Sequence, residues 1–373
     1  MESLCTKVTS GGTPSRSDLT LWEDGVIPWF KTGELNDWYV EDAEEKITLE
    51  ALSKSSAKLF PQNTVLMAMY GDGKTITSLG ILRNEAATNQ ACFAMIADPA
   101  KCDFLYLFYA LKYHRHELLK LVVAGAQRNL SSGIIRKFKI ITFPLPEQKR
   151  IAAILSTYDD LIENNRRRMA LLEEAARQVY QEWFVRLRFP GYEHTRIVDG
   201  VPEGWERMPL ESALVLQRGF DLPSQDRLDG SVPIYASTGV NGRHNIAKAK
   251  APGVVTGRSG SLGMVHYVHE DYWPLNTTLW VKEFRRASPL FAFFLLSSLR
   301  LDQYNGGVSV PTLDRKVVHK IEVVVPNNKI QALFGDYVMP MLTQLRNLGI
   351  YNDKLRAARD LLMPKLMSGE ITV

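Results

Sequence analysis

One segment of the sequence invites a phosphate-binding interpretation. Tyr70-Gly71-Asp72-Gly73-Lys74-Thr75 ends in Gly-Lys-Thr, as the phosphate loops of nucleotide-hydrolysing enzymes do. That motif also needs a glycine five positions before Gly73, where this chain has Ala68, and a helix that begins at the threonine. No apolar helical pattern starts there. We therefore do not expect a nucleotide site, and two interpretations remain: a basic loop close to DNA phosphates, or a plain surface turn.

Histidine and cysteine spacing gives little support for a metal centre. His266 and His269 are three positions apart, but in a strand over 264–268 they would not share a face. Cys92 and Cys102 lack a further Cys or His at ligand spacing, so we interpret them as buried thiols. We expect no metal site and no cofactor site in this chain.

Several polar, basic loops have the composition of a DNA-reading surface. Lys and Arg hold phosphates, whereas Arg, Lys, Asn, Gln, Ser and Thr discriminate base edges, so loops with both kinds beside Gly are the candidates. Arg128 and Arg258 rank first, because Arg can bind guanine through two hydrogen bonds. The alternative is that these side chains are only solvated. The candidates of the first half are Lys31, Thr32, Lys74, Thr75, Gln127, Arg128, Asn129 and Ser131. Those of the second half are Arg243, His244, Asn245, Arg258, Ser259, Asn305, Ser309 and Lys316.

Composition is that of an ordinary folded protein. The chain has 373 residues, 45% of them apolar and 23% charged, which excludes a disordered or collagen-like chain and suggests two or three domains. A net charge of +4 permits a nucleic-acid partner without requiring one. Because we find no signal peptide, no apolar run of membrane-spanning length and only three cysteines, we expect a cytoplasmic protein without a membrane partner.

A long amphipathic helix is predicted in the middle of the chain. Over 147–184, apolar residues recur at alternating steps of three and four, without Gly or Pro, and Pro146 stands just before the start. At 1.5 Å per residue this helix would be about 57 Å long. Arg166, Arg167 and Arg168 lie in its middle and cannot share one face, because three successive helical residues turn through about 200°. We interpret them as a solvated face or as a docking surface for a partner.

A second long helix is predicted near the C-terminus. Its apolar stripe covers 329–362 and is interrupted by Pro340 and Gly349, which predicts a kink or a restart near Pro340. Narrow apolar seams on two long helices favour pairing as an antiparallel coiled coil.

The remaining sequence predicts two mixed blocks of strands and short helices. Short apolar runs bounded by Gly, Pro, Asn or Asp indicate strands, and longer apolar stretches indicate one helix in each block. The predicted strands are Thr64–Met69, Lys139–Phe143, Gly253–Thr256 and Ile321–Val325, and the predicted helices are Phe104–Lys120 and Pro289–Leu301.

The order of these elements suggests an internal duplication, and short matches support it. A single shared dipeptide means nothing, but the matches keep the same order along both halves. The first copy carries about 23 extra residues between 33 and 78. The matched pairs are Glu2-Ser3 with Glu211-Ser212, Ile27-Pro28-Trp29 with Val232-Pro233-Ile234, Thr32-Gly33 with Thr238-Gly239, Ser78-Leu79-Gly80 with Ser261-Leu262-Gly263, Asn89 with Asn276, and Lys139-Ile140 with Lys320-Ile321.

The helical segments resemble a known family. Pro146-Glu147-Gln148-Lys149-Arg150-Ile151-Ala152-Ala153-Ile154-Leu155-Ser156 is similar to the start of the central helix in specificity subunits of type I restriction-modification systems. Leu161-Ile162-Glu163-Asn164-Asn165-Arg166-Arg167 and Trp183-Phe184 resemble its later part, and residues 355–371 resemble the second helical signature. The resemblance covers the whole chain in the expected order, with specific helical motifs and globular blocks that match only in outline.

The resemblance implies an α+β fold with two tandem target recognition domains, separated by two long helices that pair as an antiparallel coiled coil with pseudo-twofold symmetry. It implies domain 1 over 1–146, a spacer helix over 147–186, domain 2 over 187–326, and a C-terminal helix and tail over 327–373. Each domain would read one half of a split, asymmetric site in double-stranded DNA.

The resemblance also implies partners. The helices would fix the unread gap and dock two methyltransferase subunits, which transfer a methyl group from S-adenosylmethionine to adenine N6, and endonuclease/translocase subunits would join them. The chain itself would not be an enzyme and would bind no cofactor.

One feature departs from the family pattern. Val201-Pro202-Glu203-Gly204-Trp205-Glu206-Arg207 introduces the second domain, and the first copy lacks this lead-in. We expect either a start further upstream or an incomplete opening strand in the first domain.

Two other classes of function remain open at this stage. One is a coiled-coil scaffold whose globular ends bind proteins without DNA specificity. The other is the recognition half of a split enzyme in which this chain supplies catalytic residues, although no methyltransferase or nuclease motif is present.

Overall fold

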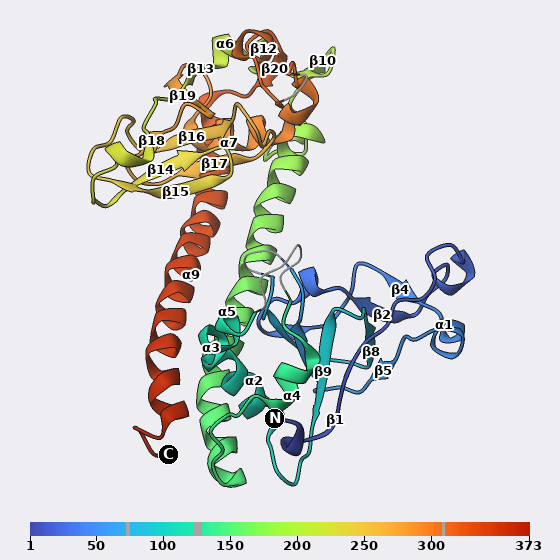
Figure 1. Cartoon of the computed structure of the whole chain (residues 1–373). Helices are drawn as coiled ribbons and strands as arrows, with labels where there is room; N and C mark the ends of the chain where they lie inside the picture. Colours follow the sequence, from blue (N-terminus) through green and yellow to red (C-terminus); the bar gives the residue numbers. More distant parts are fainter. Residues whose placement is uncertain (72–74, 123–128, 308–309) are drawn as a thin grey trace. The chain divides into compact units, whose positions relative to one another are not determined.

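The computed structural model describes residues 1–71, 75–122, 129–307 and 310–373. These residues form two compact units, each built from one β-rich domain and parts of both long helices (Figure 1). Unit 1 comprises Met1–Arg166 with Gly349–Val373, and unit 2 comprises Arg167–Leu348. The division cuts through both long helices, so neither helix belongs to one domain alone.

Unit 1 contains two sheets and a group of helices. The strand order is β1-β9-β6-β7-β3 in the larger sheet and β4-β2-β8-β5 in the smaller one. The strands are β1 (Cys5–Ser10), β2 (Ile27–Phe30), β3 (Tyr39–Val40), β4 (Lys46–Ile47), β5 (Leu59–Phe60), β6 (Val65–Ala68), β7 (Leu79–Leu82), β8 (Ala86–Thr88) and β9 (Cys92–Ala97). The helices are α1 (Leu49–Lys54), α2 (Phe104–Tyr113), α3 (Arg115–Lys120), α4 (Ser132–Lys137) and the long α5 (Leu145–Tyr180), which ends in a π-turn over Gln181–Val185.

Unit 2 repeats this plan with smaller sheets. Its main sheet has the order β13-β19-β16-β17, beside the sheet β15-β14-β18 and the pairs β12-β20 and β10-β11. The strands are β10 (Ile197–Val198), β11 (Val201–Pro202), β12 (Glu206–Pro209), β13 (Leu214–Arg218), β14 (Val232–Ala236), β15 (Gly239–His244), β16 (Gly253–Gly257), β17 (Val265–Val268), β18 (Trp273–Pro274), β19 (Thr278–Phe284) and β20 (Glu322–Val325). The helices are α6 (Leu210–Ala213), α7 (Pro289–Ser298), α8 (Arg315–Val318) and the long α9 (Asn328–Ser368).

The predicted internal duplication is visible in the strand pairing. In unit 1 β1 pairs with β9, β9 with β6 and β6 with β7, all antiparallel. In unit 2 β13, β19, β16 and β17 pair in the same way. The second sheets agree too, since β2 runs parallel to β8 and β14 runs parallel to β18. Two copies of one topology therefore stand in tandem along the chain.

Backbone hydrogen bonds correct the detail of the sequence matches. Trp29 pairs with Ala87 as Ile234 pairs with Trp273, which supports the match of 27–29 with 232–234. The N–H of Asn89 donates to Phe30 O, and the N–H of Leu275 donates to the equivalent Tyr235 O. Asn89 is therefore equivalent to Leu275, so its match with Asn276 is wrong by one residue.

Two further matches are also misaligned. Ser78 O accepts the N–H of Ala68, and Met264 O accepts the equivalent N–H of Gly257. Ser78 is therefore equivalent to Met264, so the match of Ser78-Leu79-Gly80 with Ser261-Leu262-Gly263 is wrong by three positions. Phe138 O accepts a hydrogen bond from the amino group of Met1, and Ile321 O accepts one from the equivalent N–H of Leu210. The match of Lys139-Ile140 with Lys320-Ile321 is therefore wrong by two positions. Loops of different length shift the register by amounts that short motifs do not reveal.

Each long helix is attached to its domain by a buried glutamine near the helix start. In unit 1, Gln148 Oε1 accepts the N–H of Asp103 at 3.0 Å, and its Nε2 donates to Lys101 O and Phe143 O at 3.1 and 2.8 Å. Asp103 also caps α2 through its side chain, so the glutamine fixes the start of that helix. Gln148 has only 1% of its surface exposed.

The same arrangement occurs in unit 2. Gln331 Oε1 accepts the N–H of Ser288, the capping residue of α7, at 2.7 Å. Its Nε2 donates to Arg286 O and Pro326 O, both at 2.8 Å. Gln148 of α5 is therefore equivalent to Gln331 of α9, and equivalent residues of the two long helices are 183 positions apart in the sequence.

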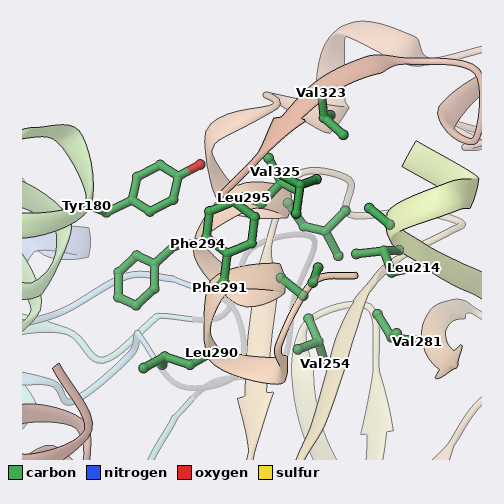
Figure 2. Packing of buried hydrophobic residues seen from close by; sticks show 14 of the residues in the cluster. Tyr180, Leu214, Val254, Val281, Leu290, Phe291, Phe294, Leu295, Val323 and Val325 are labelled. Carbon is green, nitrogen blue, oxygen red and sulfur yellow. The ribbon is translucent and has the colours of Figure 1, made fainter. Parts of the chain in front are cut away.

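Apolar packing holds the helices to the sheets. In unit 1 the core joins Ile151 and Leu155 of α5, Leu366 of α9 and Tyr106 of α2. Figure 2 shows the core of unit 2, where Phe291 and Phe294 of α7 lie among strand residues and Tyr180 of α5. Helix α7 is apolar on all sides because it is covered by the sheet and by the long helices. Fully burying each such aromatic side chain contributes about 1.5–3 kcal/mol.

The predicted antiparallel pairing of the long helices is confirmed. In unit 1, Asp159 of α5 pairs with Arg359 of α9, and Asn165, further along α5, bonds to Asn352, further back along α9. In unit 2, Trp183 of α5 packs on Phe334 near the start of α9.

Some predicted elements agree with the structure and others do not. The strands over 64–69, 253–256 and 321–325 correspond to β6, β16 and β20, and the helix over 147–184 corresponds to α5 with its π-turn. The predicted strand Lys139–Phe143 is wrong, since these residues form no strand. Its equivalent, β20, is a strand because β12 pairs with it, and no described strand of unit 1 supplies such a neighbour for 139–143.

Three helix predictions need correction. The predicted helix Phe104–Lys120 is two helices, because the backbone of His114 leaves helical geometry where its ring packs on Phe138. The predicted helix Pro289–Leu301 ends at Ser298. The predicted restart near Pro340 is absent: α9 continues through it, since buried Val338 and Leu342 hold the helix on both sides of the lost hydrogen bond.

The buried glutamine of α5 gives a stability prediction. Gln148→Leu removes three hydrogen bonds and leaves buried backbone groups without partners. We expect the free energy of unfolding to fall by about 2–4 kcal/mol, since each unpaired buried polar group costs about 1–3 kcal/mol. Urea denaturation of the full chain measures it. Gln178→Leu is the control, because Gln178 is exposed on the same helix; equal midpoints for both variants would contradict the anchoring role.

The asparagine pair between the long helices gives a second prediction. The amides of Asn165 and Asn352 are buried and joined by one hydrogen bond of 2.8 Å. Asn165→Leu should lower the free energy of unfolding by about 1–3 kcal/mol, because it leaves the buried amide of Asn352 without a partner. Changing both residues to Leu should bring the stability back close to the native value. The equivalent positions of unit 2 are Met169 and Leu348, so the site tolerates apolar side chains. A double-mutant cycle in urea tests this, and additive losses would refute it.

Candidate nucleic-acid interface

Three loops of unit 2 meet beyond the end of β16, where two of the predicted DNA contacts lie. The backbone N–H groups of Arg258 and Ser259 donate to Thr277 O at 2.8 and 3.1 Å. From the other side, the N–H of Leu313 donates to Arg258 O at 2.8 Å, and Ser259 forms a bridge with Thr312. Backbone bonds thus hold the loop after β16 between the loop before β19 and the loop before α8, and the structure brings Arg258 and Ser259 close to the Asn305 loop.

Asn305 organises one of these loops. Its Oδ1 accepts the N–H groups of Gly307 and Thr312, both at 2.9 Å, so this oxygen spans the loop. A Cβ on Gly307 would lie 2.0 Å from Val310 O, which is why glycine is required there. The Nδ2 donors of Asn305 are not used by these bonds. Asn305 therefore positions the loop and can still offer an N–H donor to a ligand.

Arg258 is half-buried at the base of the same cluster. Its Nη1 donates to Asn276 O at 3.4 Å, a weak bond that orients the guanidinium group. Lys316 is exposed on α8, which directly follows the cluster, and Asp314 caps that helix by accepting the N–H of Lys316 at 2.9 Å. We call the surface of Arg258, Ser259, Asn305 and Thr312 the unit 2 loop cluster.

The predicted residues of the β14–β15 hairpin do not share one environment. Arg243 and Asn245 are exposed, and Arg243 donates from Nη1 to Ser231 O. His244 has only 4% of its surface exposed, and its Nδ1 accepts the N–H of Leu228 at 3.1 Å. That ring supports the hairpin from inside. Arg243 and His244 pair with the start of β14, away from the turn at 237–238.

Unit 1 has an equivalent loop cluster built on the same backbone bonds. The N–H of Leu130 donates to Met69 O at 2.9 Å, as that of Leu313 does to Arg258 O, and Tyr70 forms a bridge with Asn129 as Ser259 does with Thr312. We call the surface of Tyr70, Thr75, Asn129 and Ser131 the unit 1 loop cluster.

Its predicted members are partly exposed. Thr75 and Asn129 are half-buried, and Ser131 is exposed where its Oγ caps α4 by accepting the N–H of Ile134 at 3.4 Å. Thr75 begins a turn that leads into β7, not a helix, as expected for a segment that is not a phosphate loop. Four further predicted contacts lie outside the described residues: Lys74, Gln127, Arg128 and Ser309.

Lys31 and Thr32 lie at a different place in unit 1, at the end of β2. Lys31 Nζ is 2.8 Å from Glu44 and 3.2 Å from Glu45. Hydrogen bonds from Arg16 above all, and from Lys31, lower the pKa of Glu45 to about 2. The charge of Lys31 is therefore already balanced inside the domain, and Thr32 is half-buried beside it.

The cysteine and histidine side chains singled out in the sequence have structural surroundings. Cys92 and Cys102 are buried as predicted, and burial raises the pKa of the Cys102 thiol to about 12. Burial also lowers the pKa of His266, whose ring packs beside Tyr235. Within the described ranges no group of three or more His, Cys, Asp or Glu side chains is arranged to hold a metal ion. None of the helices formed by the described residues combines the length and apolar character that a membrane span requires.

Sequence reasoning missed some polar residues at these surfaces. Thr312 belongs to the unit 2 loop cluster, and Thr277 O accepts the N–H groups of Arg258 and Ser259. Arg227 is tied to the hairpin by its bond from Nη1 to Asn241 O at 2.9 Å. The signal was weak, because isolated Thr residues in loops are common and only the backbone pairing brings these segments together.

Comparisons with known proteins agree with this architecture. Residues 1–174 match the family described as "Type I restriction modification DNA specificity domain". The chain is 25% identical over 402 residues to the type I restriction enzyme MjaIX specificity subunit of Methanocaldococcus jannaschii, covering 98% of this chain and 91% of that one. It is 29% identical over 155 residues to the EcoR124I/EcoR124II specificity subunit of Escherichia coli, covering 40% of this chain and 38% of that subunit.

A solved structure has the same fold. The crystal structure of the S subunit of a type I restriction-modification system from M. genitalium superposes with a TM-score of 0.65 at 19% identity, over 98% of this chain and 94% of that one. The two β-rich domains and the packed long helices are common to both. With this fold and these sequence matches, the chain belongs to the specificity (S) subunits of type I restriction-modification systems, the non-catalytic members that provide the DNA specificity of these complexes.

Proposed function

We propose that this subunit reads a bipartite, asymmetric site in double-stranded DNA, with one half-site for each β-rich domain. The observation that carries the proposal is the pair of loop clusters, which rest on equivalent backbone bonds but carry different side chains. Tyr70 and Asn129 stand in unit 1 where Ser259 and Thr312 stand in unit 2. Equivalent frames favour the same mode of approach to DNA, and different side chains favour different base sequences.

In this proposal the domains are 1–146 and 187–326, and the helical segments 147–186 and 327–373 form the spacer between them. The DNA contacts include Thr75, Asn129 and Ser131 of the unit 1 loop cluster and Arg258, Ser259 and Asn305 of the unit 2 loop cluster. The remaining predicted contacts are Lys31, Thr32, Lys74, Gln127, Arg128, Arg243, His244, Asn245, Ser309 and Lys316. Of these, Lys31 and His244 have the least support, because one is paired within the domain and the other is buried.

The exposed apolar residues of the long helices support docking of partner subunits. Leu171 of α5 and Leu361 of α9 each have 71% of their surface exposed, and Tyr337 has 58%. Covering these side chains with a partner protein would remove apolar surface from water. We propose two methyltransferase subunits there, which supply S-adenosylmethionine and methylate adenine N6, with endonuclease/translocase subunits joining the complex in the cytoplasm. Arg166 and Arg168 are exposed on α5 and suit docking as well as solvation.

Exchanging one domain tests the bipartite reading. Residues 187–326 are replaced with the matching segment of a relative that methylates a different site. We expect one half of the methylated motif to change while the other half is retained, because each domain reads alone. Adenine-methylome sequencing of cells that express the hybrid with its methyltransferase measures this. A simultaneous change in both halves would rule out separate readers.

Arg258→Ala tests the unit 2 loop cluster directly. Losing a two-bond contact to a base should weaken specific binding by about 1–3 kcal/mol, or roughly five- to 150-fold, with little effect on non-specific DNA. Fluorescence anisotropy of the assembled methyltransferase on target and scrambled duplexes measures both. Lys282→Ala is the control, since Lys282 is exposed in β19 beyond the cluster. An equal loss for the two variants would mean that only charge matters here.

A further inference from the structure

A small polar cavity in unit 1 is enclosed by the helix pair and the first domain. It has a volume of about 200 Å³. Four cationic side chains line it: Lys112 of α2, Arg166 of α5, and Arg356 and Arg359 of α9. Asp37 and Asp159 are the two carboxylates in its wall. The lining therefore carries more positive than negative charge.

The two carboxylates already have partners that satisfy them. Asp37 accepts a hydrogen bond of 2.6 Å from Arg115, a residue outside the lining, and another of 3.0 Å from the N–H of Leu79. Asp159 is bonded to Arg359 and accepts the hydroxyl of Tyr109 at 2.8 Å. Among the described residues, these pairings leave Lys112 with no carboxylate at ion-pair distance, and its Nζ donates only to a backbone carbonyl.

The remaining donors differ in how strongly they are engaged. Lys112 Nζ is 3.3 Å from Asp37 O, a neutral acceptor, and burial lowers the pKa of this ammonium group. Arg166 stands 3.7 Å from Glu163, and Arg356 bonds to the exposed Asp353 at 2.7 Å.

A buried donor points to a ligand independently of these charges. Trp38 lines the cavity and has only 3% of its surface exposed, and its Nε1–H meets no acceptor among the described residues. Native structures rarely leave such a group unpaired, so an acceptor is expected beside it.

The equivalent place in unit 2 has a different chemistry. At the offset of 183 residues that relates α5 to α9, Asp159 corresponds to Leu342 and Arg359 to Ala176. Both line the cavity of unit 2, together with Phe294. That cavity has an apolar wall. Glu173 and Arg177 also line that cavity, but the two positions of the ion pair are apolar there, whereas unit 1 has the pair of Asp159 with Arg359, three further cations and an indole N–H that meets no acceptor among the described residues.

We propose that the cavity of unit 1 binds a small tetrahedral oxyanion, for which inorganic phosphate is the probe. The volume equals that of about six or seven waters, at roughly 30 Å³ each, and lies below the ~300 Å³ of sites for drug-sized ligands. A phosphate accepts hydrogen bonds from the Trp38 indole, the Lys112 ammonium and the guanidinium groups of Arg356 and Arg166. It links α2, α5 and α9 and so stabilises the attachment of the first domain to the helices. The proposal does not depend on DNA reading.

Isothermal titration and thermal unfolding of the full chain test the site. Phosphate is titrated into chloride buffer at constant ionic strength, without DNA. We expect saturable binding at one site and a rise in melting temperature that follows the occupancy. Lys112→Met and Trp38→Phe should each weaken binding about tenfold, since each removes one donor. Lys354→Met should leave the affinity unchanged, because Lys354 is exposed on α9 and does not line the cavity.

Two outcomes would overturn the proposal. One is the absence of saturable phosphate binding by the native chain, as expected if the cavity holds only water or accepts only phosphates of a DNA backbone. The other is an equal loss of affinity in Lys354→Met and Lys112→Met, as expected for diffuse attraction to a basic surface. Arg356→Gln keeps the test decisive if Trp38→Phe does not fold, because Arg356 is partly exposed and removing its charge leaves the core intact.

Discussion

The attachment of each long helix to its domain depends on one buried amide. Gln148 and Gln331 each receive the capping N–H of a domain helix and donate to two carbonyls, so the three segments that meet there have one common fixed point. An amide supplies one acceptor and two donors, which no other side chain of this length combines. Because the same contact occurs at both helix starts, the two β-rich domains meet their helices in the same way.

The two units share this backbone arrangement but differ in the side chains that it carries. Sheet order and loop-to-loop bonds agree, whereas the residues at the ends of those bonds do not: Tyr70 and Asn129 in unit 1, Ser259 and Thr312 in unit 2. Backbone pairing tolerates almost any side chain, so a duplicated scaffold can keep its geometry while its surface changes. Two surfaces with different side chains on one architecture are the consequence.

Two pairs of equivalent positions on the long helices are polar in unit 1 and apolar in unit 2. Unit 1 has an amide pair and the ion pair of Asp159 with Arg359 where unit 2 has leucine, methionine and alanine. Buried polar pairs add little net stability, but they fix which residues face each other, because any shift leaves polar groups unpaired. The polar contacts thus set the register, and the aromatic core around Phe334 adds apolar burial in unit 2.

The sequence by itself determined the periodic elements, the duplication and the family. The α5 stripe and the strands β6, β16 and β20 follow from hydrophobic spacing, which is local, and the buried thiols of Cys92 and Cys102 follow from the lack of further ligands near them in sequence. The register between copies, the missing strand at 139–143 and the burial of His244 were decided only by tertiary structure. Each depends on a partner distant in sequence: a strand needs a neighbour, and a loop residue is exposed or covered according to what packs on it. Motif order therefore identifies the repeat, while backbone pairing decides which residues are equivalent.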